Sequence, residues 1–455
     1  MTTPSPKTKK TNGAFTRRRA LKLVAASAVL PLVHIRTGRA GGKVSVAFWD
    51  HWVPSGNAVM QKQVDAWAAK NQVEVQADFI TAVGQKNVLT IAAEHQAKTG
   101  HDIQTFPTWE VHNNADSLVP IDDVMKRLTE KYGPVNQVCE YLAKVKGNWL
   151  AVPSSSGTQH KGPCARISVL KEKAGIDVVE MYPAKDVHTG ASDAWTWDTH
   201  YKAAEACAKA GMPFAIGLGQ TTDSVDTAGA LFRAFGAELV DKDGNITVKS
   251  DNVRAVLEYG QKLVKVLPDD AVSYDDASNN RALISGKSAL IWNPPSAWAV
   301  AKRDAPQIAA DCWTFAPPAG PEGRFLPYLP YFWGVWSFSK NQTAAKELIE
   351  ALMQREPVEQ RCNEVIGYDV PPFTSMLDFK IWQEVEPPKG TVYNYPIRSS
   401  HKSTAHIAAL PAPPEIAVQI YNRGTMPTML AKLKSGQSIN EVIAWANDEL
   451  EGFAR

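Results

Sequence analysis

Cysteines at metal-binding spacing are missing from this 455-residue sequence. The five cysteines are far apart, with no C-x-x-C among them, which argues against the common zinc and c-type haem motifs. They are Cys139, Cys164, Cys207, Cys312 and Cys362. Their odd number leaves at least one thiol unpaired in a monomer. Whether the others form disulfides or stay as buried free thiols is open at this point.

Acidic residues are absent from the first 40 positions, which hold nine Lys or Arg. The rest of the chain therefore carries 40 basic residues against 47 acidic ones, and the formal charge of +2 for the whole sequence hides this acidic excess. A chain of that sign offers no general attraction for nucleic acid or anionic lipid. We expect no nucleic-acid partner.

Residues 1–40 are predicted to be an export signal, with a basic start, an apolar stretch at Leu23–Val33 and small residues up to Ala40. The apolar stretch is well short of the ~20 residues of a membrane-spanning helix. Arg17 and Arg18 before Leu21 resemble a twin-arginine signal, which implies the twin-arginine export machinery as a partner; a plain secretory signal is the alternative. No cysteine follows the stretch, so we expect a periplasmic protein without a lipid anchor.

Catalytic signatures are missing as well. The sequence has no G-x-S-x-G elbow and no H-E-x-x-H pair. The glycines Gly217 and Gly219 do not continue to G-x-G-x-x-G, because position 222 is Thr. The ten histidines show no metal-ligand spacing. We therefore expect neither a cofactor nor a metal, and a protein that is not an enzyme.

Apolar strand-like runs alternate with helix-like segments, which predicts an α/β fold with a mainly parallel sheet. Strands are expected at 44–49, 73–80, 101–106, 286–292 and 333–338, and helices at 56–71, 85–98, 197–209, 228–235, 253–266, 343–354, 416–433 and 438–453. In such sheets ligands bind beyond the carboxyl ends of strands. Two polar and aromatic segments, 50–52 and 108–110, lie at such ends.

Several short motifs occur in an order that resembles the family 1 extracellular solute-binding proteins, the maltose-binding-protein-like group of ABC importers. They are Asp102–Ile103 with Leu118–Asp123, Gly147–Pro153, Leu170–Ile176, Thr196–Asp198, Gly286–Trp292, and Pro317–Pro321 followed by Tyr331–Gly334. The sequence departs from the family pattern at Lys146, at Ser288–Leu290 and at Tyr331–Phe332. These departures leave the identity of the ligand open.

The resemblance implies a two-lobed periplasmic-binding-protein fold of type II, the Venus flytrap, in which each lobe is a mixed sheet flanked by helices. Three hinge crossings are expected near 153–157, 286–291 and 337–341. Residues 41–153 and 288–338 would then form lobe 1, and residues 154–287 and 339–455 would form lobe 2 with the C-terminal helices. The implied partners of this monomer are a small ligand, bound by hinge closure, and the membrane subunits of an ABC importer.

Fourteen tryptophans point to a ligand with apolar faces and polar edges, as in a carbohydrate or polyol. Aromatic rings provide flat apolar platforms, and carboxylates, amides and hydroxyls provide directed hydrogen bonds. The candidate ligand-binding residues are Trp49, Asp50, Trp52, Trp109, Glu110, Gln159, Asp223, Trp292, Trp298, Tyr331, Trp333 and Tyr368. For each aromatic residue, packing in a core is the alternative.

Two other functions stay open. The same fold would take an anionic ligand, a glycerol phosphodiester or a sulfonated sugar, if cationic side chains line its cleft. The candidates for that role are Lys161, Arg166, Arg281 and Arg398. An exported carbohydrate-active enzyme would instead need paired carboxylates such as Asp50 and Glu110.

Overall fold

A six-stranded mixed sheet forms the centre of one half of the molecule in the computed structural model, which describes residues 42–384 and 398–453. The expected export signal lies outside these residues. The strand order is β11-β10-β3-β1-β2, with β6 also paired to β10. Their bounds are β1 Lys43–Trp49, β2 Glu74–Ile80, β3 Ile103–Pro107, β6 Ala151–His160, β10 Arg324–Val335 and β11 Ser403–His406. The parallel pairing of β1 with β2 and β3 confirms the predicted strand-helix alternation.

Helices on both sides of this sheet complete a group of elements that we call lobe 1. They are α2 Pro54–Asn71, α3 Lys86–Ala97, α4 Glu110–Asn113, α5 Asp122–Tyr132, α6 Gln137–Ala143, α16 Gln342–Leu352, α17 Arg355–Glu364 and α18 Ile381–Glu384, with the hairpin β4 Lys144–Val145 and β5 Asn148–Trp149. Helix α2 starts at Pro54, whose fixed φ suits the first helical turn, and it buries Met60 and Val64.

A smaller three-stranded sheet of order β8-β7-β9 forms the centre of the other group, which we call lobe 2. Its strands are β7 Cys164–Arg166, β8 Leu290–Ile291 and β9 Cys312–Thr314. Its helices are α7 Ile167–Ala174, α8 Val178–Met181, α9 Gly190–Asp193, α10 Trp197–Lys209, α11 Thr222–Ala234, α12 Asp251–Leu263, α13 Ser278–Ile284, α14 Pro294–Asp304, α15 Pro306–Ala309, α19 Pro414–Asn422, α20 Thr425–Lys434 and α21 Ile439–Phe453.

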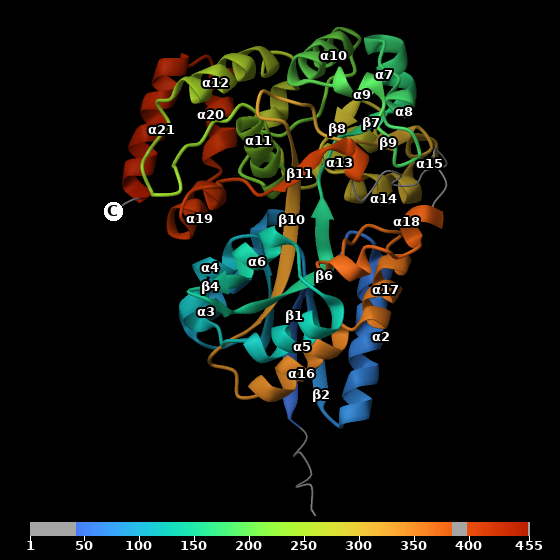
Figure 1. Cartoon of the computed structure of the whole chain (residues 1–455), viewed down its shortest axis with the longest axis vertical. Coiled ribbons are helices and arrows are strands. Elements are labelled where there is room, and N and C mark those ends of the chain that lie inside the picture. The colour runs from blue at the N-terminus through green and yellow to red at the C-terminus, as the bar shows by residue number, and fades with distance from the viewer. Residues whose placement is uncertain (1–41, 385–397, 454–455) are drawn as a thin grey trace, which may run out of the picture. The chain divides into compact units, whose positions relative to one another are not determined.

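The paired strands β6 and β10 run side by side from one lobe to the other (Figure 1). Their ladder is interrupted by a bulge at Pro330, which has no N–H to donate. There the Thr158 hydroxyl accepts a hydrogen bond from the Tyr331 N–H over 2.9 Å and replaces the missing ladder partner. The Pro330 carbonyl accepts from the Thr108 N–H at 3.0 Å, which ties β3 to the same point.

Two of the expected crossings and the lobe boundaries differ from the structure. The stretch 286–291 stays in lobe 2, because β8 pairs with β7 there. Residues 337–341 stay in lobe 1, because they lead from β10 to α16, which packs on α2 and α5. The segment 288–314 thus belongs to lobe 2 and the segment 342–364 to lobe 1, the reverse of the prediction. The error came from placing crossings next to short apolar runs.

Several helices and one strand of lobe 2 begin or end at other residues than predicted. Helix α11 begins six residues before the expected start because the Thr221 side chain caps it by accepting from the Ser224 N–H. Gly424 divides the expected C-terminal helix 416–433 into α19 and α20, since it adopts a left-handed conformation with φ 58°. The predicted strand at 286–292 is reduced to the two residues of β8.

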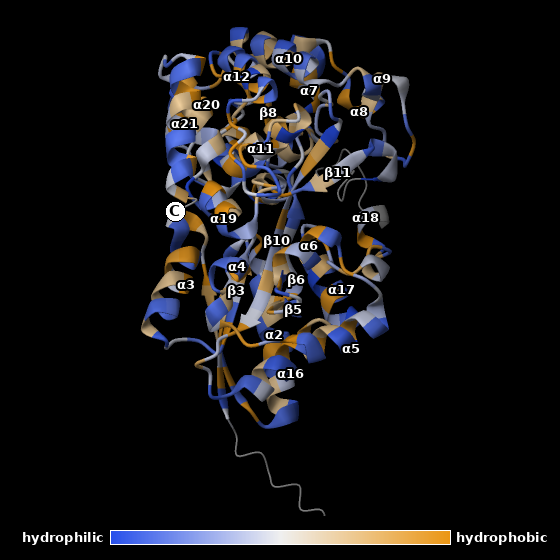
Figure 2. Cartoon of the chain, turned by 60° about the vertical axis from the view of Figure 1, so that its left-hand side comes forward, coloured by the Kyte–Doolittle hydropathy of each residue, from blue (hydrophilic) through white to orange (hydrophobic). Residues whose placement is uncertain are grey.

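The main apolar core contains buried residues of both lobes. The peripheral helices α16 and α21 show both hydrophilic and hydrophobic colouring in Figure 2, as amphipathic helices do. All five cysteines are free and buried, which settles the alternatives left open by the sequence. Within the described residues, none of the helices is both long and apolar enough to cross a membrane.

Gly157 in β6 tests how closely this strand packs against side chains of β1 and β10. Its φ is 85°, and a Cβ there would lie 2.8 Å from Trp49 and 2.9 Å from Tyr331. Gly147 has a nearly equal φ of 86° with open space around it. We expect Gly157→Ala to lower the free energy of unfolding by about 1–3 kcal/mol more than Gly147→Ala, because only the former adds overlap to backbone strain. Urea unfolding of both variants measures this; equal losses would contradict the packing described.

Candidate ligand-binding site

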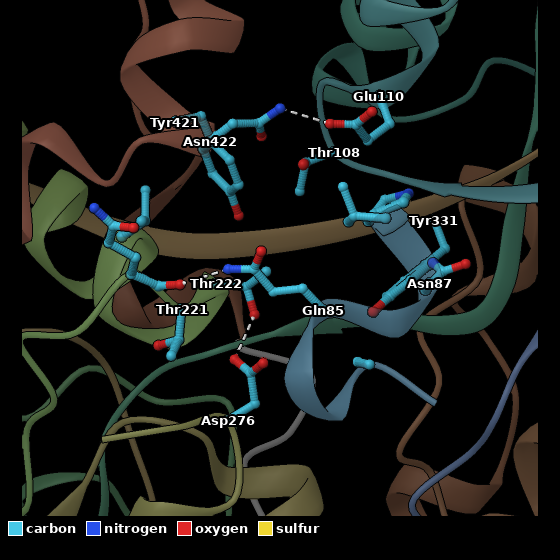
Figure 3. Close-up of a pocket in the computed structure, with 15 residues that line it drawn as sticks. Gln85, Asn87, Thr108, Glu110, Thr221, Thr222, Asp276, Tyr331, Tyr421 and Asn422 are labelled. Atoms are coloured by element: carbon cyan, nitrogen blue, oxygen red, sulfur yellow. Dashed lines mark hydrogen bonds between the residues drawn. The ribbon is translucent and has the colours of Figure 1, made fainter. Parts of the chain in front are cut away.

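A small pocket of about 120 Å³ lies between the lobes and is lined by both of them (Figure 3). Lobe 1 contributes Ala82, Gln85, Asn87, Val88, Pro107, Thr108, Glu110 and Tyr331, and lobe 2 contributes Gln220, Thr221, Thr222, Val225, Asp276, Tyr421 and Asn422. Between the described residues that line this pocket, two hydrogen bonds cross from lobe to lobe. The Gln85 amide donates to the Gln220 carbonyl at 3.2 Å, and the Asn422 amide donates to Glu110 at 2.7 Å.

The lobe 1 wall is formed where chain segments end or turn sharply. Thr108 directly follows β3 and has a φ of 46°, and Gln85, which precedes α3, has a φ of 58°. A positive φ is unusual for any residue with a Cβ, and more so for β-branched Thr, and such strain is concentrated at functional sites. Glu110 starts the short helix α4, which brings its carboxylate to the pocket.

The lobe 2 wall is formed by the first turn of α11 and the segment before α13. Thr221 caps α11, and Thr222 donates through its hydroxyl to Asp276 over a long 3.4 Å. Tyr421 of α19 donates to Asp226 at 2.9 Å, which anchors α19 to α11 beneath the wall. The wall therefore presents hydroxyls, an amide and a carboxylate to the pocket.

A buried ammonium group supports the lobe 2 wall from behind. Lys161 follows β6, is 1 % exposed, and places its Nζ 3.0 Å from Asp223 and 2.5 Å from Asp226 of α11. Burial lowers the pKa of Lys161, but the two carboxylates outweigh it and raise the pKa, so the group stays protonated. The other oxygen of Asp223 accepts from the amides of Asn279 at 2.7 Å and Asn293 at 2.9 Å.

The carboxyl group of Asp276 differs from an ordinary aspartate in its pKa. Burial and the neighbouring carboxylate of Asp223 raise the pKa of Asp276 to about 7, against the opposing effect of Lys161. Burial and the nearby carboxylates also raise the pKa of the Tyr331 hydroxyl, which stays protonated. Among residues 42–384 and 398–453, that hydroxyl has no hydrogen-bond partner, so it is free to bind a ligand.

An aromatic cluster adjoins the pocket through Tyr331. The Trp49 ring lies 5.2 Å from the Tyr331 ring and 6.2 Å from the Tyr368 ring, with Trp52 packed on the group. His51 holds the cluster in place because its Nε2 contacts Asp369 at 3.0 Å while its Nδ1 accepts from the Val53 N–H. This accepting role leaves the proton on Nε2.

The predicted site residues fall into two groups. Glu110 and Tyr331 line the pocket, Asp223 lies directly behind its wall, and Trp49, Trp52 and Tyr368 belong to the adjoining aromatic cluster. The remaining six, which do not line the pocket, are Trp109, Trp292, Trp298, Trp333, Asp50 and Gln159.

The surroundings of these six residues explain their positions. The Trp109 indole donates to the Ala408 carbonyl at 3.1 Å, Trp292 stacks on Trp197, and Trp333 packs on Phe48 in the core of lobe 1. Trp298 is inside helix α14, which starts with two prolines. Asp50 accepts from the Asn57 amide, and Gln159 is buried in β6 opposite Leu329.

Sequence reasoning missed most of the polar lining. Gln85, Asn87, Tyr421 and Asn422 come from helix ends that carry no motif. Thr221 and Thr222 directly precede the predicted residue Asp223 in the sequence but were not themselves predicted. Within the described chain, no group of three or more His, Cys, Asp or Glu is arranged to hold a metal ion.

Two lobes joined by paired strands, with a pocket lined by both, define a two-lobed ligand-binding protein. The sequence model for bacterial extracellular solute-binding proteins matches residues 46–387, and the chain belongs to this family.

Solved structures of the same fold are similar along nearly their whole length. Maltose-bound MalE3 of T. maritima has a TM-score of 0.67 at 17% identity and covers 90% of this chain and 99% of its own. An ABC transporter solute-binding protein of Thermotoga lettingae bound with α-D-tagatose has a TM-score of 0.70 at 15% identity, covering 91% and 100%. One from Agrobacterium vitis with bound D-mannitol has a TM-score of 0.65 at 18% identity, covering 90% and 98%.

A curated relative matches a shorter stretch. A probable ABC transporter-binding protein of Deinococcus radiodurans is 29% identical over 132 residues, which is 28% of this chain. The match spans 30% of that relative's length.

Lys161 is expected to be essential for the lobe 2 wall. Lys161→Met would leave Asp223 and Asp226 buried without a cation, which should cost about 3–5 kcal/mol of unfolding free energy near neutral pH. The loss should shrink as the pH falls, because burial raises the pKa of Asp226 and its carboxyl group then binds a proton in the folded state.

The matched control is Lys202→Met. Lys202 contacts Asp198 at 2.6 Å with both side chains more than 70% exposed, and such pairs contribute little. Chemical denaturation at several pH values compares the two variants. A loss for Lys161→Met as small as that for Lys202→Met would contradict the role described.

Proposed function

We propose that this protein captures a small carbohydrate or polyol in the pocket between its lobes. The observation that carries this proposal is the pocket itself, whose polar lining comes from both lobes. A ligand that touches both Thr108 and Thr222 is bound fully only when the lobes are together. Ligand binding then shifts the population toward the closed arrangement by the energy of those shared contacts.

The chemistry of the pocket fits a polyhydroxylated ligand. Sugar hydroxyls both donate and accept hydrogen bonds. The pocket lining contains amides and hydroxyls, which also donate and accept, and carboxylates, which accept. Tyr331 offers both its unpaired hydroxyl and the edge of the aromatic cluster, against which apolar C–H faces pack. The similar proteins with maltose, tagatose and mannitol support the same ligand class.

The proposed physiological role is delivery to the membrane subunits of an ABC importer. Membership of the extracellular solute-binding family and the similarity to a probable ABC transporter-binding protein support this role. The basic, apolar and small-residue pattern of residues 1–40 supports export to the periplasm through the twin-arginine machinery.

The two alternative functions have less support. None of the residues that line the pocket is Lys or Arg, so an anionic ligand would lack fixed donors of opposite charge. Arg166 is paired with Asp311 and Arg281 with Asp275. The carboxylate pair expected for a glycosidase is not assembled in the pocket, because Asp50 does not line it.

Calorimetric titration with mono-, di- and trisaccharides and sugar alcohols tests this proposal. We expect at least one to bind, and Tyr331→Phe to weaken that binding by about 2- to 13-fold, because it deletes one hydrogen bond worth roughly 0.5–1.5 kcal/mol. Tyr201→Phe is the control: its hydroxyl bonds to Glu205 on the same helix, away from the pocket, and its loss should leave affinity unchanged.

Two results would speak against the proposal. Absence of binding and of thermal stabilisation across the whole panel would exclude carbohydrate capture. Turnover of a glycoside by the purified protein would favour the enzyme alternative.

A further inference from the structure

Negative charge dominates the pocket and the groups directly behind it. Four carboxylates, those of Glu110, Asp223, Asp226 and Asp276, are accompanied by the single ammonium of Lys161. Because Lys161 is held between two of the carboxylates, it cannot neutralise the others. A ligand entering the pocket therefore meets an excess of negative charge that the described residues do not balance.

The carboxylates differ in how well they are satisfied. Glu110 receives hydrogen bonds from three side-chain amides: Asn422 at 2.7 Å, Asn113 at 3.0 Å and Asn114 at 3.2 Å. Asp276 receives a single long one, 3.4 Å from the Thr222 hydroxyl. The open acceptor positions of the pocket are thus concentrated on Asp276.

Another buried acceptor, in the layer behind the pocket wall, is also without a donor among the described residues. Asn293 is 3 % exposed, and its amide nitrogen donates to Asp223, which leaves its carbonyl oxygen without a partner among the described residues. Buried acceptors without donors are costly, and a buried carboxylate without a cation is more so. The carboxyl group of Asp276 therefore lacks hydrogen-bond donors, and the pocket together with the groups behind it lacks positive charge.

We propose that the ligand of this pocket is an amino sugar or amino polyol, and that Asp276 is the carboxylate that receives its ammonium group. This inference rests on the proposed function and specifies its ligand class. An ammonium supplies both missing elements at once, since it brings three donors and a positive charge, whereas a hydroxyl brings one donor and no charge.

The charged and titratable groups around Asp276 are consistent with this role. Asp223 of α11 faces it, with Lys161 behind, and Asp275 in its own segment is paired with Arg281. Tyr331 faces it from β10 as a neutral phenol. Burial and Asp223 raise the pKa of Asp276 to about 7 against the opposing effect of Lys161, so its carboxyl group is only partly ionised near neutral pH. Binding of an ammonium would lower that pKa and expel the carboxyl proton.

The test compares each sugar with its amino and acidic counterparts. Binding is measured by calorimetry on the protein as it is exported. The probes are hexoses and hexitols, their 6-amino-6-deoxy and 2-amino-2-deoxy derivatives, and the matching uronic acids and 6-phosphates. We expect one amino compound to bind at least about tenfold more tightly than its parent, and its acidic counterpart to bind more weakly than both.

Asp276→Asn should weaken binding of that amine by about 10- to 100-fold and binding of the parent hexose by a clearly smaller factor, because only the amine loses a charged partner. Asp243→Asn, in an exposed turn outside the pocket, is the matched control and should change neither. For wild-type protein, the affinity for a 6-amino compound should fall about tenfold from pH 8 to pH 6, since its alkyl amine stays protonated while Asp276 takes up a proton.

Two outcomes would contradict this inference without contradicting the proposed function. In the first, a neutral sugar binds as tightly as its amine at every pH. In the second, Asp276→Asn weakens both equally. If none of the sugars binds, charged or neutral, the proposed function itself fails. Titrations of wild type at several pH values decide the question even if the variant does not fold.

Discussion

The antiparallel pairing of β6 with β10 is the constraint on which the other features of this molecule depend. Both strands extend through the two lobes, so their register fixes where lobe 1 ends and lobe 2 begins. The bulge at Pro330 lies within this pair, and Thr158 and Thr108 each bond to it. Tyr331, the next residue, is thereby placed at the pocket, with Gly157 leaving room for its ring beside Trp49.

The same strands also position a charged group behind the pocket. Lys161 directly follows β6, so the ammonium that holds the first turn of α11 is positioned by the strand that crosses between the lobes. This arrangement keeps a charged, polar wall in a fixed place. It also engages the Lys161 ammonium in contacts with Asp223 and Asp226 rather than with Asp276.

The sequence predicted the fold better than the site. Apolar runs and helical spacing located β1, β2, β3 and their helices closely, because each pattern reflects burial of one face or of both. The lobe boundaries were misplaced because β8 and α16 look the same in sequence whichever sheet they join. That choice depends on pairing between segments that are far apart along the chain.

The site was predicted in part, for a physical reason. Glu110 and Tyr331 were found because they lie at strand ends or in a family motif. Trp292 and Trp333 share the same local pattern but pack into cores. The residues next to a tryptophan in the sequence do not distinguish one that packs in a core from one that lines a pocket. Gln85 and Asn422 face the pocket only because distant segments meet there, so no sequence signal was available for them.

A crystal structure of the protein with its best-binding sugar tests the central claim most directly, namely that both lobes hold the ligand. We predict electron density for the ligand in the pocket, with direct contacts to Thr108 or Glu110 of lobe 1 and to Thr222 or Asp276 of lobe 2. A ligand bound to one lobe alone, or at another place on the molecule, would contradict this claim.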